Sequence, residues 1–149
     1  MPGALFDTNA WLAAIFTSHP AHAAAQNALL LATPAEPAIF CRPTQLSFVR
    51  LASTPALQKV YGAIGMTNRD ALTALDALQA LPQVRVADEP LGTFALWREF
   101  ANLATASPKV WMDAYLAAFA VTGGFCMVTL DGDFRAYTDR GLDLELITA

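Results

Sequence analysis

Short apolar runs alternate along the chain with longer segments in which apolar residues recur every three or four positions. The short runs predict buried strands, and the longer periodic segments predict helices. The strand-like runs are residues 3–6, 38–41, 83–86, 125–130 and 144–147. Helical periodicity occurs in residues 11–16, 21–32, 44–52, 67–78, 91–104 and 108–122. This alternation predicts an α/β domain with a mostly parallel sheet.

Proline, glycine and one threonine mark several of the element boundaries. The Thr67 hydroxyl is placed to cap the helix that follows it, and Pro82 ends that helix. Pro108 is placed to start the last long helix, and the pair Gly123 and Gly124 to end it. No repeat or low-complexity segment interrupts the pattern, so we expect residues 1–149 to form a single domain.

Composition adds an expectation about assembly and location. Apolar residues make up 55% of the chain and charged residues 15%, which leaves apolar surface for a partner and favours self-association. The longest apolar runs, 10–16 and 114–121, fall short of the ~18 residues that cross a bilayer. The chain also opens without a basic, cleavable leader, so a cytoplasmic location is expected.

Charge limits how this chain could hold nucleic acid. The formal net charge of -4 argues against a broad basic surface. Local contacts remain open, because a few basic side chains could form a restricted patch. These are Arg42, Arg50, Lys59, Lys109 and Arg135.

Three aspartates interrupt apolar surroundings. Asp7 closes the run 4–6, Asp113 lies within the apolar segment 110–116, and Asp131 closes the run 127–130. Burying an ionised carboxylate is costly unless a positive charge compensates it. Because no lysine or arginine adjoins any of the three in sequence, we expect one divalent cation to be their common partner.

Topology brings these acids within reach of one another. Asp7 and Asp131 follow strand-like runs, and ligands of open parallel sheets bind at the carboxyl ends of the strands. Asp113 lies early in its helix, one position off the apolar face. Carboxylate oxygens suit Mg²⁺ or Mn²⁺, and such an ion can support hydrolysis of a phosphodiester.

Ordinary structural roles exist for each of these residues. Asp7 could cap the next helix, Asp113 could be a first-turn acid, and Asp131 could be a turn residue before glycine. Asp133 is better explained as a solvated turn acid, although it could bind an ion through water. Asn9 and Thr129 could hydrogen-bond a ligating carboxylate, or serve as a cap and a strand end.

Four motifs occur in the order found in PIN-domain ribonucleases: LFDTN (5–9), CRPTQLSFVR (41–50), WMDAYL (111–116) and VTLDGDF (128–134). The chain most resembles the VapC toxins of that family. The resemblance implies a three-layer α/β/α sandwich and Mg²⁺- or Mn²⁺-dependent endoribonuclease activity. It also implies a homodimer, and silencing by a small VapB antitoxin whose tail covers the active site. By position, Asp7, Asp113 and Asp131 would form the acidic cluster.

One position departs from the pattern. Where the family usually has a glutamate after the second strand, this chain has Gln45, which can accept a hydrogen bond from an ion's water but adds no charge. A weakened, PIN-like binding module is therefore one alternative. Another is a haloacid-dehalogenase-type phosphatase, but that class needs a second aspartate where this chain has Asn9.

Overall fold

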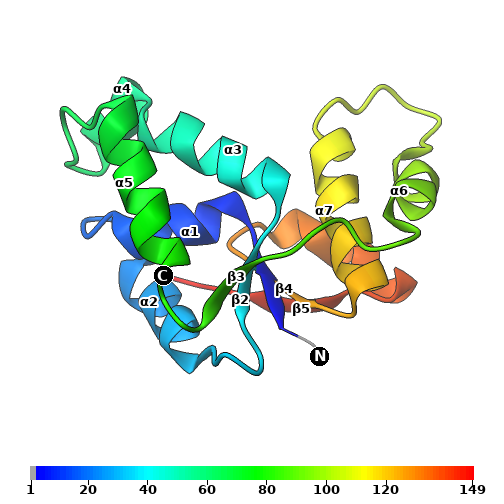
Figure 1. The fold of residues 1–149 in the computed structure, drawn as a ribbon. Helices are drawn as coiled ribbons and strands as arrows, with labels where there is room; N and C mark the ends of the chain where they lie inside the picture. Colours follow the sequence, from blue (N-terminus) through cyan, green and yellow to red (C-terminus); the bar gives the residue numbers. More distant parts are fainter. Residues whose placement is uncertain (1–2) are drawn as a thin grey trace.

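Five parallel strands form the central sheet of the computed structural model, which describes residues 3–149 (Figure 1). Their order across the sheet is β3-β2-β1-β4-β5, and every neighbouring pair is parallel. The strands are β1 (Ala4–Phe6), β2 (Ala38–Phe40), β3 (Val84–Val86), β4 (Cys126–Thr129) and β5 (Asp143–Leu146). The predicted α/β class with a parallel sheet is confirmed.

Seven α-helices and one 3₁₀ helix connect the strands in the described part of the chain. They are α1 (Thr8–Ile15), α2 (His22–Leu31), α3 (Arg42–Ala52), α4 (Pro55–Val60), α5 (Asn68–Gln79), α6 (Thr93–Ala101), α7 (Val110–Gly123) and η1 (Gly132–Arg140). The sequence pattern missed α4, which is too short for helical periodicity to show. It also took the start of η1 for a simple turn, because 3₁₀ hydrogen bonding does not follow the 3.6-residue period.

The strands alternate between two hydrophobic cores, as expected where successive side chains point to opposite faces. Phe6 and Val128 face one core, which they share with α1, α2, α3 and α5. Leu5, Ile39 and Met127 face the other core, against α6, α7 and η1. Figure 1 shows these two groups of helices on opposite sides of the sheet, so the expected three-layer α/β/α sandwich is confirmed.

Two predicted helix boundaries are observed in detail. The Thr67 hydroxyl accepts a hydrogen bond from Asp70 N at 3.1 Å, and Asp70 Oδ2 accepts one from Thr67 N at 2.9 Å. Gly124 ends α7 with φ 69°, a left-handed conformation that favours glycine. The local signals that set these boundaries therefore act as the sequence indicated.

The order of the strands places a topological switch point between β1 and β4. From β1 the chain builds outward to β2 and β3, and later adds β4 on the other side of β1. Phe6 pairs with Val128, and Asp7 N donates to Val128 O at 2.9 Å. The residues that follow β1 and β4 thus emerge together, where ligands of open α/β sheets bind.

Helix length sets one further limit. Within residues 3–149, no helix is both long and apolar enough to cross a membrane.

Candidate functional site

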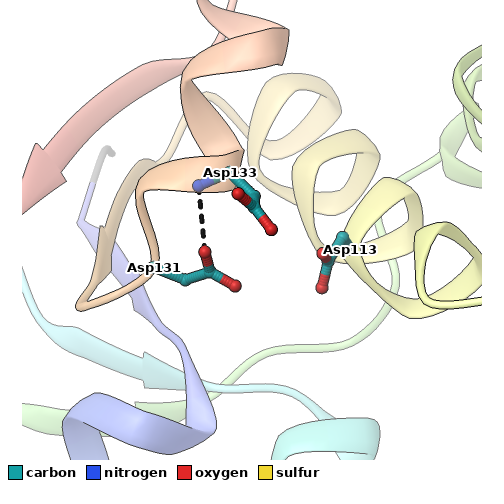
Figure 2. Close-up of side chains that lie close together, drawn as sticks. All are labelled: Asp113, Asp131 and Asp133. Atoms are coloured by element: carbon teal, nitrogen blue, oxygen red, sulfur yellow. Dashed lines mark hydrogen bonds between the residues drawn. The ribbon is translucent and has the colours of Figure 1, made fainter.

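Three carboxylates converge beside the switch point. One carboxylate oxygen from each of Asp113, Asp131 and Asp133 lies within 4.8 Å of the others. Figure 2 shows the three side chains pointing toward one another, Asp113 from α7 and the other two from the segment after β4. The structure therefore gathers two of the predicted aspartates with the one that the sequence assigned a lesser role. We call Asp113, Asp131 and Asp133 the acidic cluster.

Asp131 and Asp133 are fixed relative to each other by the start of η1. Asp131 caps this helix, and its Oδ1 accepts a hydrogen bond from Asp133 N at 2.9 Å (Figure 2). Burial raises the pKa of Asp131, but that hydrogen bond and the nearby Lys109 ammonium together bring the pKa below its ordinary value. Asp131 is thus held ionised, with Oδ2 directed toward the cluster. Asp133 is largely exposed, as expected of a turn acid, yet it belongs to the cluster.

Asp7 is a half-buried neighbour of the acidic cluster. It caps α1, and its Oδ1 accepts from Thr8 N at 2.7 Å while its Oδ2 accepts from the Thr129 hydroxyl at 2.7 Å. Burial is the main cause that raises the pKa of Asp7, and the negative charges of Asp113 and Asp131 add to it. Asp7 therefore fulfils the ordinary capping role and also feels the charge of the other two aspartates.

Thr129 connects Asp7 to the turn that carries Asp131. Its fully buried hydroxyl donates to Asp7 Oδ2 and accepts from Asp131 N at 3.0 Å. Asn9 adds a second tie, because its Nδ2 lies 3.3 Å from Thr129 Oγ1 and its Oδ1 accepts from Leu130 N at 3.1 Å. These bonds connect the residues that follow β1 to those at the end of β4. That Asn9 and Thr129 affect the binding of an ion stays a prediction.

Lys109, which the sequence suggested only as part of a restricted basic patch, contacts the acidic cluster, and this contact was not predicted. Its Nζ lies 2.6 Å from Asp133 Oδ2, 3.0 Å from Asp131 Oδ2 and 3.6 Å from Asp113 Oδ2. The expectation that no basic side chain compensates these acids was therefore wrong. Lys109 precedes Asp113 by four residues at the start of a helix, a spacing that brings two side chains onto one face. That spacing was the available signal.

The contacts of Lys109 test whether a cation fits the acidic cluster. An ammonium group already lies against all three carboxylates, so the geometry accommodates a positive charge at their meeting point. Burial is the main cause that raises the pKa of Asp113, while Lys109 lowers it and the charge of Asp131 raises it further. Carboxylates that repel one another in this way gain from a shared cation. Oxygen donors of this type suit Mg²⁺ and Mn²⁺.

Comparison with known proteins decides the family. The family model described as the PIN domain matches residues 4–139. The chain belongs to the PIN-domain family. Ribonuclease VapC41 of Mycobacterium tuberculosis, from two strains, is 43% identical to it in an alignment of 146 residues that covers 96% of this chain and 97% of the relative. This degree of identity places this PIN domain with the VapC proteins, as the four motifs indicated.

Solved structures agree on the fold of this PIN domain. VapBC2 from Rickettsia felis, in a crystal structure with a DNA fragment from the promoter, matches with a TM-score of 0.65 and 14% identity, over 97% of this chain and 98% of the other. VapBC-1 from nontypeable Haemophilus influenzae matches with a TM-score of 0.65 and 13% identity, over 98% of each chain. VapC20 of Mycobacterium tuberculosis, a sarcin-ricin loop cleaving toxin, matches with a TM-score of 0.59 and 19% identity, over 90% of this chain and 94% of that one.

Gln45 has protein partners at both ends of its amide in this PIN domain. Its Oε1 accepts a hydrogen bond from Arg42 Nη1 at 2.8 Å, and its Nε2 donates to Gln79 Oε1 at 2.6 Å. The side chain is buried and joins the start of α3 to the end of α5. The carbonyl oxygen that was expected to face an ion's water thus bonds Arg42. A supporting role of Gln45 toward a metal stays a prediction.

Proposed function

We propose that this protein is the toxin of a VapBC-type toxin–antitoxin pair, a metal-dependent endoribonuclease that hydrolyses RNA phosphodiester bonds. Family membership supports the nuclease activity and argues against the haloacid-dehalogenase-type phosphatase. The observation that carries the assignment is the acidic cluster, which lies beside Asp7 at the switch point of the sheet. Its carboxylates already contact one positive group, the ammonium of Lys109. We propose Mg²⁺ or Mn²⁺ as the ion.

Each aspartate then has a distinct task in the proposed reaction. Asp7 and Asp113 would hold the ion, and Asp131 would complete the site or orient the attacking water. Asp133 acts from the exposed rim, where its oxygens can accept hydrogen bonds from water. When bound, a divalent ion offsets negative charge on the phosphate and activates water for attack. The chain contributes the fixed placement of its carboxylates, so little reorganisation is needed in the transition state.

Thr129 and Asn9 fix the positions of the aspartates and of the backbone between them. Thr129 donates to Asp7 and accepts from the Asp131 backbone, so a shift of either aspartate breaks one of its hydrogen bonds. Asn9 fixes the intervening backbone at Leu130. Residues of this kind, which orient ligands without touching the ion, typically alter metal affinity or activity by about 10–100-fold when replaced.

Cleavage of RNA in the presence and absence of metal tests the assignment. Purified protein, freed of its antitoxin, should cut structured RNA with Mn²⁺ or Mg²⁺ and leave it intact with EDTA. Activity that persists in EDTA would contradict a metal-dependent nuclease. Absence of cleavage with either ion, across several structured RNAs, would favour the alternative of a PIN-like binding module weakened at Gln45.

We further propose a partner and a cellular context. Residues 1–149 act as one PIN-like domain in the cytoplasm, and a small VapB-type antitoxin covers the site. Two of the similar solved structures are those of VapBC2 from Rickettsia felis and VapBC-1 from nontypeable Haemophilus influenzae. The charge of this chain, -4, suits an antitoxin segment that brings basic side chains to the acidic cluster. RNA is the proposed substrate, and its recognition by shape leaves no linear signature in the chain.

A homodimer in solution is the prediction for assembly. Large apolar side chains are exposed on α6, α7 and the loop before α6, including Trp111, which is 57% exposed and packs against Trp97. The others are Leu91, Phe94 and Met112. Apolar surface of this kind favours self-association. Light scattering at micromolar concentration should give twice the mass of one chain, and a strictly monomeric protein would contradict the proposal.

Replacing Gln45 with glutamate should strengthen metal binding if this residue supports the ion. The added charge should lower the Mg²⁺ concentration for half-maximal cleavage by about tenfold or more, the size of a charge-assisted hydrogen bond. Arg42, which already bonds Oε1, can pair with the new carboxylate, and the Gln79 amide can turn to donate. The wild type should also work better with Mn²⁺ than with Mg²⁺.

The control for this variant is Gln83→Glu. Gln83 directly precedes β3 and therefore lies at the amino ends of the parallel strands. The acidic cluster lies at the opposite, carboxyl ends. Titration of cleavage with both ions compares the two variants. If Gln45→Glu and Gln83→Glu give the same metal dependence, Gln45 does not act on the ion. An inactive wild type that Gln45→Glu rescues would favour the binding-module alternative.

A further inference from the structure

The Lys109 ammonium is the common partner of the whole acidic cluster. It lies within 3.6 Å of one oxygen from each of Asp113, Asp131 and Asp133, although its own side chain is 62% exposed. An exposed lysine that met one acid by chance would touch a single carboxylate. Here the three acids come from two separate elements, α7 and the segment after β4, and converge on one nitrogen.

The contacts also show which oxygens Lys109 occupies. It uses the Oδ2 atom of Asp113, Asp131 and Asp133, while Oδ1 of Asp131 is committed to the Asp133 backbone. A divalent ion held by Asp113 and Asp131 would compete with the ammonium, because Oδ2 is the oxygen of Asp131 that is not committed to the backbone. Two cations that share a carboxylate repel each other more strongly as they approach. Binding of the ion would therefore displace the ammonium.

This exchange is energetically feasible because the Lys109 side chain is 62% exposed, so its ammonium can return to water at little cost. Its pair with Asp133, whose side chain is 71% exposed, is a surface pair of the kind that contributes little. The side chains of Asp113 and Asp131 are only 19% and 27% exposed, so their interaction with a cation depends more on its charge. A divalent ion carries twice the charge and binds several oxygens at once. It can displace the ammonium and still bind, but with an affinity reduced by the competition.

Displacement changes what Lys109 can bind next. It occupies the capping position of α7, one turn before Asp113, so the released ammonium stays tethered at the rim of the site. A phosphodiester that approaches the bound ion brings a negative charge to the same place. The chain has one other lysine, Lys59, which lies on α4. Lys109 is thus the lysine placed to take a phosphate oxygen once its carboxylates are occupied.

We propose that Lys109 is a tethered counter-cation that a divalent ion displaces from the acidic cluster and that then binds the phosphate of the RNA. The inference rests on the proposed function and adds that binding of the divalent ion and binding of the RNA are coupled through Lys109. While Lys109 is engaged by carboxylates it is not available to RNA, so metal binding promotes RNA binding through this residue. By thermodynamic reciprocity, RNA that holds Lys109 promotes metal binding to the same extent.

Two binding measurements with opposite expected signs test the inference. Calorimetric titration of the full chain with Mn²⁺, without RNA, should give roughly three- to tenfold tighter binding for Lys109→Met than for the wild type, since a weak competitor is lost. Lys59→Met removes the same charge from a distant, exposed position and should change the affinity by less than about twofold. Lys109→Arg keeps the positive charge and should stay close to the wild type.

RNA binding should change in the other direction. A fluorescent single-stranded 2′-O-methyl RNA, with Ca²⁺ in place of the catalytic ion, serves as the probe. Lys109→Met should weaken its binding, and the slope of log affinity against log salt should become shallower by about 0.7, as expected for one lost phosphate contact. Lys59→Met should leave the slope unchanged. A residue with a purely structural role would weaken metal and RNA binding together.

The outcomes separate this inference from the proposed function. Equal or weaker Mn²⁺ binding by Lys109→Met overturns the competition, and an unchanged RNA affinity overturns the transfer to phosphate, even in a protein that cleaves RNA normally. Conversely, the opposite shifts can be observed in a protein that cuts no RNA, and then the inference stands and the nuclease assignment fails. If neither the wild type nor Lys109→Met binds Mn²⁺, the inference and the proposed function are both wrong. Circular dichroism establishes that each variant is folded.

Discussion

Replacing Asp113 or Asp7 with asparagine is expected to abolish RNA cleavage while the fold is retained. Asparagine keeps the shape of the side chain but removes the charge that holds the ion, so cleavage should fall by at least about 10³-fold, in line with the several kcal/mol that such ions supply. At position 7, asparagine also preserves the cap of α1, because it caps helices as well as aspartate does. Single-turnover cleavage with saturating Mn²⁺ provides the measurement.

Metal-free stability gives a second readout for the same variants. The pKa of both carboxyls is raised in the folded chain, chiefly by burial, so their ionisation disfavours folding. As pH rises from below the ordinary value of 3.8 through the raised pKa, the wild type loses stability that the asparagine variants keep. In EDTA at neutral pH, both variants should therefore melt at a higher temperature than the wild type.

Asp76→Asn is the control for these variants. Asp76 is exposed on α5, on the helix surface away from the acidic cluster, and its replacement should leave cleavage unchanged. Wild-type cleavage rates for Asp113→Asn or Asp7→Asn in the same metal would show that the proposed site is wrong. A lower melting temperature in EDTA would show instead that the charge is compensated within the protein.

Replacing Thr129 with valine should damage both the stability and the site. The buried hydroxyl donates to Asp7 and accepts from Asp131 N, and valine leaves both groups without this partner. The free energy of unfolding should fall by about 1–3 kcal/mol, the usual penalty for buried polar groups left unpaired. Mn²⁺ affinity should also fall by about 10–100-fold, because the Asp7 carboxylate is no longer oriented.

Thr93→Val separates these two effects. Thr93 is also fully buried, and its hydroxyl donates to Pro90 O at 2.8 Å and lies 2.7 Å from the Thr122 hydroxyl. The same substitution there should reduce the stability to a similar extent and leave Mn²⁺ affinity unchanged. Chemical denaturation and calorimetry measure the two quantities. If Thr129→Val loses stability without any loss of metal affinity, the supporting role of Thr129 at the site is refuted.

Local sequence signals determined much of the fold. Apolar periodicity fixed the order of strands and helices, because each element must bury one face or stripe against the sheet. Capping chemistry located the start of α5 at Thr67, and the need for a left-handed residue located the end of α7 at Gly124. Where an element lacked a local signal, as with α4 and the 3₁₀ helix η1, the sequence did not reveal it.

Three of the acidic residues were recognisable from sequence because a carboxylate beside a buried strand or within an apolar helix is conspicuous. The structure pairs β1 with β4 in parallel, and this pairing brings Asp7 close to the turn of Asp131. The family resemblance rested on short motifs around the same residues. Its implied fold is confirmed by the parallel sheet and by the match to the PIN-domain family, with two of the motifs at the ends of β1 and β4 and two in α3 and α7.

Only the tertiary structure decided which charged atoms meet. It gathered Asp133 into the acidic cluster, held Asp7 against Thr129, and turned Gln45 toward Arg42 and Gln79. It also placed the Lys109 ammonium among three carboxylates that sequence had left without a counter-charge. Periodicity and motifs specify backbone elements and their faces, because these depend on neighbours within a turn or a strand. Contacts between long polar side chains from separate elements depend on the packed geometry of the whole chain, which no local pattern encodes.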